Sequence, residues 1–66
     1  MNVLINGEPA EIKDGSTVTE LLDQLQIGRE RVAVEVCLQI VPKASYDAHG
    51  LLEGDKIEIV HFVGGG

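Results

Sequence analysis

The sequence has no tryptophan, one phenylalanine and one tyrosine, so aromatic side chains can fill little of an interior. Its 66 residues suffice for one domain, and a domain of this size buries about 60% of the surface of its unfolded chain. Valine, isoleucine and leucine must therefore build the core. This composition favours a sheet with one helix and leaves no room for an ordinary buried catalytic cleft.

Cysteine and basic residues are also scarce. The single cysteine, Cys37, cannot form an internal disulfide, and without an activating neighbour it is expected to be structural. His49 and His61 have no second ligand at metal-binding spacing, so no metal site is expected. Five basic against eleven acidic residues give a formal charge of −6, which argues against nucleic acid or anionic membrane partners. A partner with a basic face would complement this charge.

Long apolar runs are missing, and no cationic leader precedes an apolar stretch. We therefore expect an intact cytoplasmic protein with no membrane segment. No internal repeat or low-complexity linker divides the sequence.

The first third of the sequence predicts a hairpin. Asn6 and Gly7 separate the apolar residues 3–5 from an alternating stretch around Ala10, and Asn-Gly is the strongest short signal for a tight turn. Pro9 cannot donate a ladder hydrogen bond, which places the second strand at an edge of the sheet.

A helix is predicted next. Thr17 and Glu20 have the spacing of a capping box, so the helix begins at about residue 18. Gly28 is expected to end it in the left-handed conformation. One face of the 3.6-residue period is apolar and consists of Val18, Leu21, Leu22 and Leu25.

The second half predicts three more strands. Residues 32–36 alternate as a strand does, and a bend at residues 37–39 returns the chain into residues 40–41. Residues 43–50 are mixed, with a helical turn expected near Ser45 and Tyr46. A Glu-Gly-Asp turn then leads into the last strand, residues 56–63.

The resulting order is strand, strand, helix, strand, strand, strand. A right-handed crossover through the helix makes the first and last strands parallel neighbours. The expected fold is the α+β class of ubiquitin-like β-grasp proteins, a mixed sheet of about five strands on one main helix. Residues 1–63 would form the domain, and residues 64–66 a flexible tail.

The last strand becomes apolar on both faces as it approaches its end. Ile57 and Ile59 point to one face, whereas Val60 and Phe62 point to the other. The second face is covered either by the rest of the chain or by a partner. In the partner interpretation, Val60, Phe62 and Val63 form the interface.

Three glycines follow this strand. Glycine loses more conformational freedom on ordering than any other residue, so Gly64 and Gly65 gain the domain little stability. A bare backbone ending in the carboxylate of Gly66 can instead thread into a narrow channel of a partner. The alternative is an inert tail or the remnant of a fusion.

Several segments together resemble one family. Residues 3–8, residues 32–36, the Leu-Glu-Gly-Asp-Lys-Ile-Glu-Ile segment at 52–59 and the closing Phe-Val-Gly-Gly-Gly are similar to the ThiS sulfur carriers of thiamine biosynthesis. The likeness spans the whole sequence. Cys37 departs from it, because these carriers commonly have asparagine at that turn.

The resemblance implies a carrier that performs no catalysis and binds no cofactor. An adenylating enzyme of the ThiF type would use ATP to activate the carboxylate of Gly66, and sulfur from a donor such as a cysteine desulfurase or rhodanese would convert it to a thiocarboxylate. Thiazole synthase, ThiG, would then take the sulfur for the thiazole ring. A molybdopterin synthase small subunit, a ubiquitin-like modifier and a binding module with an inert tail remain alternatives.

Overall fold

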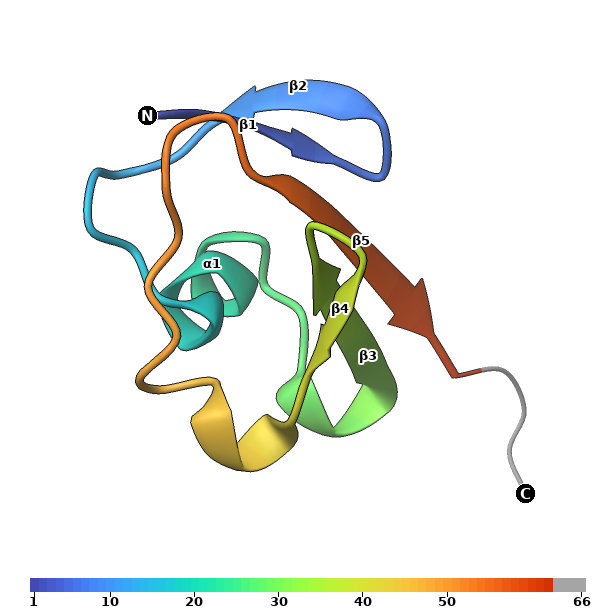
Figure 1. Cartoon of the computed structure of the whole chain (residues 1–66). Helices are drawn as coiled ribbons and strands as arrows, with labels where there is room; N and C mark the ends of the chain where they lie inside the picture. The colour runs from blue at the N-terminus through green and yellow to red at the C-terminus, as the bar shows by residue number, and fades with distance from the viewer. Residues whose placement is uncertain (63–66) are drawn as a thin grey trace.

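The computed structural model describes residues 1–62, and the prediction that the domain ends at residue 63 lies outside them, as do those on the tail at 64–66. The described residues form one five-stranded sheet in the order β2-β1-β5-β3-β4, with the helix α1 on one face (Figure 1). The elements are β1 (Asn2–Ile5), β2 (Glu8–Glu11), α1 (Val18–Gln24), η1 (Arg29–Arg31), β3 (Val32–Val36), β4 (Gln39–Val41), η2 (Lys43–Ser45) and β5 (Lys56–His61).

The strand pairing follows the predicted topology. β1 pairs antiparallel with β2 through the Asn6-Gly7 turn, where both residues have positive φ of 50° and 84°. β1 and β5 are parallel, and β3 pairs antiparallel with both β4 and β5. β2, which contains Pro9, is an edge strand as expected.

The helix begins as predicted, because the capping box is formed. The amide of Glu20 donates to Thr17 Oγ1 at 3.2 Å, and the amide of Thr17 donates to Glu20 Oε1 at 2.9 Å. These bonds satisfy two of the free N–H groups at the helix start. Residues 1–62 contain no helix that is long and apolar enough to span a bilayer.

The end of the helix was predicted wrongly. Gln26, with φ of 58°, is the left-handed residue, whereas Gly28 has φ of −73° and caps η1. The amide of Ile27 donates to the carbonyl of Leu22 at 2.9 Å and closes the last turn early. As a result Ile27 packs against the core, and Leu25, expected on the buried face, is 40% exposed.

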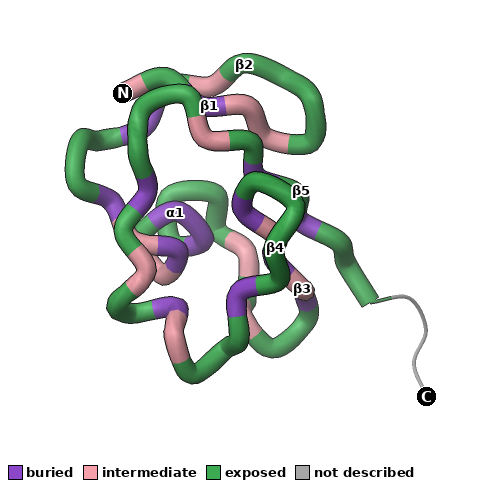
Figure 2. Tube along the Cα trace, viewed as in Figure 1, coloured by how far each residue is buried: buried purple, intermediate pink, exposed green. Residues whose placement is uncertain are grey.

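The core lies between α1 and the sheet, and Figure 2 shows the buried residues gathered there. Its largest fully buried side chain is Tyr46, which follows η2 in the segment predicted to contain a helical turn. The Arg29 guanidinium lies 5.3 Å from the centre of the Tyr46 ring. The other buried apolar residues of the core are Val3, Ile12, Val18, Leu21, Leu22, Val32, Val34, Val36, Val41, Leu51, Ile57 and Ile59.

Two further boundaries differ from the sequence expectations. The bend between β3 and β4 contains only Cys37 and Leu38, and Gln39 already belongs to β4. Both bend residues have positive φ, 51° and 71°, as a two-residue hairpin requires. β5 ends at His61, two residues before the predicted end, and Val63 lies outside the described residues.

Candidate partner-binding surface at the end of the last strand

β5 alternates between a buried and an exposed face, as the sequence predicted. Ile57 and Ile59 belong to the buried core, at 0% and 5% exposure, whereas Val60 is 54% exposed. Phe62, one step beyond the strand, is 59% exposed. Residues 1–62 thus leave both side chains largely exposed, which favours cover by a partner over cover by the rest of the chain.

The strand register extends this exposed surface across β3 and β4. Val60 lies opposite Ala33, and in the next row Glu58, Glu35 and Ile40 lie side by side on β5, β3 and β4. Ile40 is 72% exposed. We call the sheet face that carries these residues, opposite α1, the outer face.

The outer face carries an acidic pair. Glu35 and Glu58 are cross-strand partners, and like charges in that position repel each other. The ion pairs recorded within residues 1–62 join Met1 to Asp14 and Arg29 to Asp47, so neither glutamate is neutralised there. The pair therefore presents negative potential beside apolar groups.

Phe62 is held at the end of the strand by two contacts. Its amide donates to the carbonyl of Arg31 at 2.9 Å, and Lys43 Nζ lies 5.5 Å from the centre of its ring. Lys43 is fixed in turn, because Nζ donates to the carbonyl of Glu30 at 3.3 Å. Phe62 thus has a defined place at the exit of the sheet while its ring remains exposed.

The predicted site residues of the tail lie outside the described residues. These are Val63 of the interface, Gly64 and Gly65 of the threading segment and Gly66 as the attachment point. The structure places the two described interface residues, Val60 and Phe62, on the segment that leads directly into them.

Cys37 lies at the other end of β5 from the tail. Its amide donates to the carbonyl of Lys56, the first residue of β5, at 2.7 Å, and Sγ donates to Asp55 Oδ1 at 3.5 Å. From Lys56 to Phe62 the chain advances about 20 Å. Four further residues reach at most about 14 Å, so the carboxylate of Gly66 cannot easily return to the thiol of Cys37.

The groups with shifted pKa values are the Met1 amine and two aspartates on connections between elements, Asp14 and Asp47, and none of them lies on the outer face. A hydrogen bond from the Met1 amine to Asp14 raises the pKa of the amine and lowers that of Asp14. A hydrogen bond from the Thr19 hydroxyl, and then one from Arg29, lower the pKa of Asp47. Neither the Met1–Asp14 pair nor Asp47 adds a group with a shifted pKa to the outer face.

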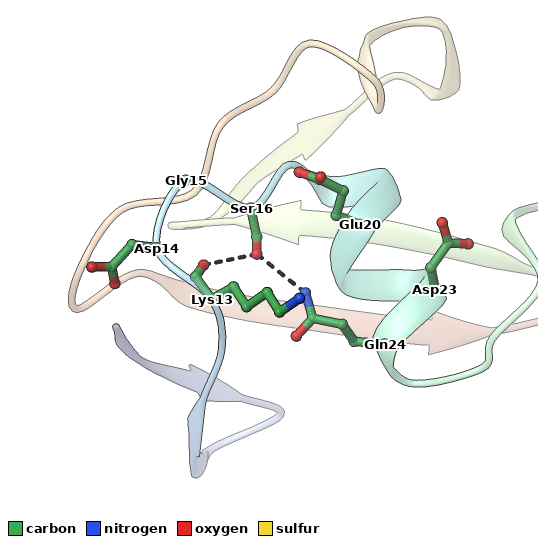
Figure 3. A pocket seen from close by; sticks show the side chains of 7 residues that line it. All are labelled: Lys13, Asp14, Gly15, Ser16, Glu20, Asp23 and Gln24. Atoms are coloured by element: carbon green, nitrogen blue, oxygen red, sulfur yellow. Dashed lines mark hydrogen bonds between the residues drawn. The ribbon is translucent and has the colours of Figure 1, made fainter.

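A shallow pocket at the start of α1 offers no competing site. Figure 3 shows that Ser16 is committed within it: its hydroxyl donates to the carbonyl of Lys13 at 2.8 Å and accepts from Gln24 Nε2 at 3.1 Å. The pocket lies on the opposite side of the molecule from the end of β5 (Figure 1). Residues 1–62 also contain no group of histidine, cysteine, aspartate or glutamate that could hold a metal ion.

Comparison with known proteins shows the family to which the chain belongs. The family model of ThiS matches residues 3–66, the glycine end included. The chain belongs to the ThiS family. Among individual members, the sulfur carrier protein ThiS of Escherichia coli is 33% identical over 66 residues, and each chain covers the other completely.

A solved ThiS structure and a larger relative complete the comparison. The crystal structure of thiamine biosynthesis protein ThiS from Geobacter metallireducens superposes with a TM-score of 0.86 at 35% identity, covering both chains completely. This confirms the predicted β-grasp fold. A thiazole synthase of Paramagnetospirillum magneticum is 47% identical over the whole chain, although the chain spans only 20% of its length.

Sequence reasoning missed part of this surface. Ala33, Glu35 and Ile40 belong to the outer face, as the strand register shows. The alternation of valines in residues 32–36 could have assigned Ala33 and Glu35 to the face opposite the core. Assigning Ile40 to this face required knowing the length of the hairpin bend, and that bend was predicted one residue too long.

Proposed function

We propose that this ThiS family member is a sulfur carrier, with the carboxylate of Gly66 as the point of attachment. A separate enzyme adenylates this carboxylate, and the adenylate is converted to a thiocarboxylate that delivers sulfur to thiazole formation in thiamine biosynthesis. The chain itself supplies recognition, reach and a reactive end, and we place these steps in the cytoplasm.

One observation carries the proposal. Val60 in β5 and Phe62 just beyond it are exposed immediately before residues 63–66, in a chain that matches the ThiS family through to its final glycine. A surface for docking thus lies close in sequence to three glycines, which have no side chain that could obstruct a channel.

The chemistry divides between the tail and its enzymes. A carboxylate is a poor electrophile, so ATP first converts it to an acyl-adenylate on a ThiF-type enzyme, with release of pyrophosphate. The terminal sulfur of a persulfide then displaces AMP, and a thiol reduces the resulting acyl disulfide to the thiocarboxylate. Gly64 and Gly65 allow the backbone to enter the active site of the adenylating enzyme and that of the sulfur acceptor, while the sheet remains outside.

Thiazole synthase is the proposed acceptor. The thiazole synthase of Paramagnetospirillum magneticum contains a segment similar to this entire chain, which supports a shared pathway and direct contact between the two activities. The sulfur donor is proposed as a class, a persulfide carried by a cysteine desulfurase or a rhodanese.

The outer face is the proposed docking surface for the activating enzyme. Val60, Phe62 and Val63 would fill an apolar site on the partner, with Ile40 at its margin. Glu35 and Glu58 fit a basic side chain of the partner, which would relieve their mutual repulsion.

Mass spectrometry of the intact chain tests the carrier function. After incubation with ATP, a ThiF-type enzyme and a sulfur donor, the chain should gain the mass of one oxygen-to-sulfur exchange, located at Gly66 by fragmentation. A chain that ends at Gly65 serves as the control and should stay unchanged. An unchanged mass of the full chain beside an active enzyme would contradict the proposal.

A pair of aspartate substitutions tests the docking surface. Phe62→Asp should raise the KM of the activating enzyme for the carrier by about tenfold or more, because a central aromatic anchor would be lost. Leu52→Asp is the matched control, since Leu52 is also exposed, at 69%, but lies in a loop before β5. Both variants should keep the circular dichroism spectrum of the parent. Equal KM values for the two variants would exclude Phe62 from the interface.

A further inference from the structure

β5 extends beyond the strand that flanks it on one side. The pairing of β1 with β5 reaches only Ile5 and Ile57, after which β1 ends in the Asn6-Gly7 turn. Four residues of β5 follow, and they lead to Phe62 and the tail. On this side the second half of β5 has no neighbouring strand.

The hydrogen-bond pattern shows which groups this leaves open. Lys56 and Phe62 bond to the two residues that flank β3: Cys37 N, just after it, donates to Lys56 O, and Phe62 N donates to Arg31 O, just before it. In an antiparallel pair the bonded residues alternate, so the main-chain groups of Ile57, Ile59 and His61 turn toward β1.

Asn6 fills the place of the missing strand. Its amide donates to the carbonyl of Ile57 at 2.8 Å. Its side chain accepts from the amide of Ile59 at Oδ1, at 2.8 Å, and donates from Nδ2 to the carbonyl of Ile59 at 3.3 Å. A carboxamide has one acceptor and one donor arranged as in a peptide group, so Asn6 pairs with Ile59 as another strand residue would.

We infer that Asn6 is a positioning residue of the carrier, which holds the second half of β5 and so fixes the point at which the tail leaves the sheet. This inference rests on the proposed carrier function. Without the side chain of Asn6, the main-chain groups of Ile59 would lose both partners on this side, and β5 would be held there by β3 alone. A strand end that frays must be ordered again each time the carrier docks, which weakens docking.

The alternative is that Asn6 serves only the tight turn. Two substitutions distinguish this role from that of holding β5. Asn6→Gly keeps a residue that adopts positive φ readily but removes the carboxamide. Asn6→Asp keeps the shape of the side chain and the acceptor for Ile59 N but places a carboxylate oxygen against Ile59 O. This second variant keeps the inference testable if the glycine variant folds poorly. Gly7→Ala is the matched control, because it strains the turn at φ of 84° and leaves the side chain of Asn6 in place.

Native-state amide exchange and loading kinetics give the two readouts. In Asn6→Gly, exchange at Ile59 should accelerate by about tenfold more than at core amides such as Val34, and the KM for loading should rise about tenfold at nearly constant kcat. Asn6→Asp keeps the acceptor for Ile59 N and loses only the bond to Ile59 O, so it should show smaller increases in both quantities. Gly7→Ala should accelerate all amides together and leave the KM unchanged.

Each other outcome overturns the inference. Uniform exchange in both Asn6 variants would show that the side chain does not hold β5, and selective exchange with an unchanged KM would make its role purely structural. If the parent chain takes up sulfur normally while the Asn6 variants do so equally well, only this inference fails. If the parent chain takes up no sulfur, the proposed function itself fails.

Discussion

Single residues show most clearly where local sequence and final structure agree. Asn6 and Gly7 are the residues that a tight hairpin turn prefers, and the structure uses them in that way. Cys37 and Leu38 occupy an equivalent bend with positive φ although neither residue favours it, and Leu38 is 87% exposed. The register of β3 and β4 imposes this conformation on them, which is why the sequence predicted the bend without its type.

The strain at this bend leads to a stability prediction. Leu38→Gly should raise the free energy of unfolding by about 0.5–1 kcal/mol, because relief of the left-handed conformation exceeds the entropy that glycine adds to the unfolded chain. Leu52→Gly, at an exposed leucine with ordinary φ, should lower it. Urea denaturation of both variants measures the difference, and a destabilised Leu38→Gly variant would contradict the strain.

The ion pair between Met1 and Asp14 predicts a pH dependence. The pKa of Asp14 is lowered from 3.8, so its contribution is present above that value and is lost as the pH falls through the folded pKa. The pKa of the Met1 amine is raised from 8.0, so its contribution is present below that value and is lost as the pH rises through the folded pKa. The difference in unfolding free energy between the parent and Asp14→Asn should therefore form a plateau between these limits. A difference that does not change with pH from 2 to 10 would contradict this pairing.

At the scale of elements, periodicity predicted which faces are buried but not where elements end. The two faces of β5 and the start of α1 were predicted correctly, since alternation and the capping box are local signals. The end of α1 was not, because Gly28 is a strong local signal that the core overrode. Partial burial of Ile27 against the core accompanies the turn of the chain at Gln26, and only the packed structure shows this contact.

Adjacent residues of β5 should respond very differently to truncation. Ile59→Ala should lower the free energy of unfolding by about 2–4 kcal/mol, because it leaves a cavity between the sheet and α1. Val60→Ala, on the outer face, should lower it by no more than about 1 kcal/mol. Chemical denaturation at constant pH measures both. Similar losses for the two variants would mean that the outer face is packed in solution.

At the scale of the whole molecule, charge and topology decide how the site is presented. The tail and the apolar end of β5 could be found from sequence, because they are contiguous. The pairing of Glu35 with Glu58 and the contact of Asn6 with Ile59 could not, because each joins residues far apart along the chain. The sequence therefore predicts the contiguous part of the candidate site, and only the structure shows the part that depends on contacts between distant residues.

The formal charge of −6 predicts that loading depends on salt. Raising the ionic strength from about 0.05 to 0.5 M should increase the KM of the activating enzyme several-fold, because screening weakens attraction to a basic partner face. The double variant Glu35→Gln and Glu58→Gln should show a smaller increase. A KM that stays constant with salt in the parent chain would show that charge does not guide the encounter.

β5 lies in the middle of the sheet, between β1 and β3, and it continues directly into residues 63–66. When a partner pulls on the residues beyond β5, the load runs along the strand axis and acts in shear on the hydrogen bonds to β3 and, in the first half of the strand, on those to β1, rather than opening them one by one. A carrier built in this way can be withdrawn from one active site and inserted into the next without unravelling from its working end.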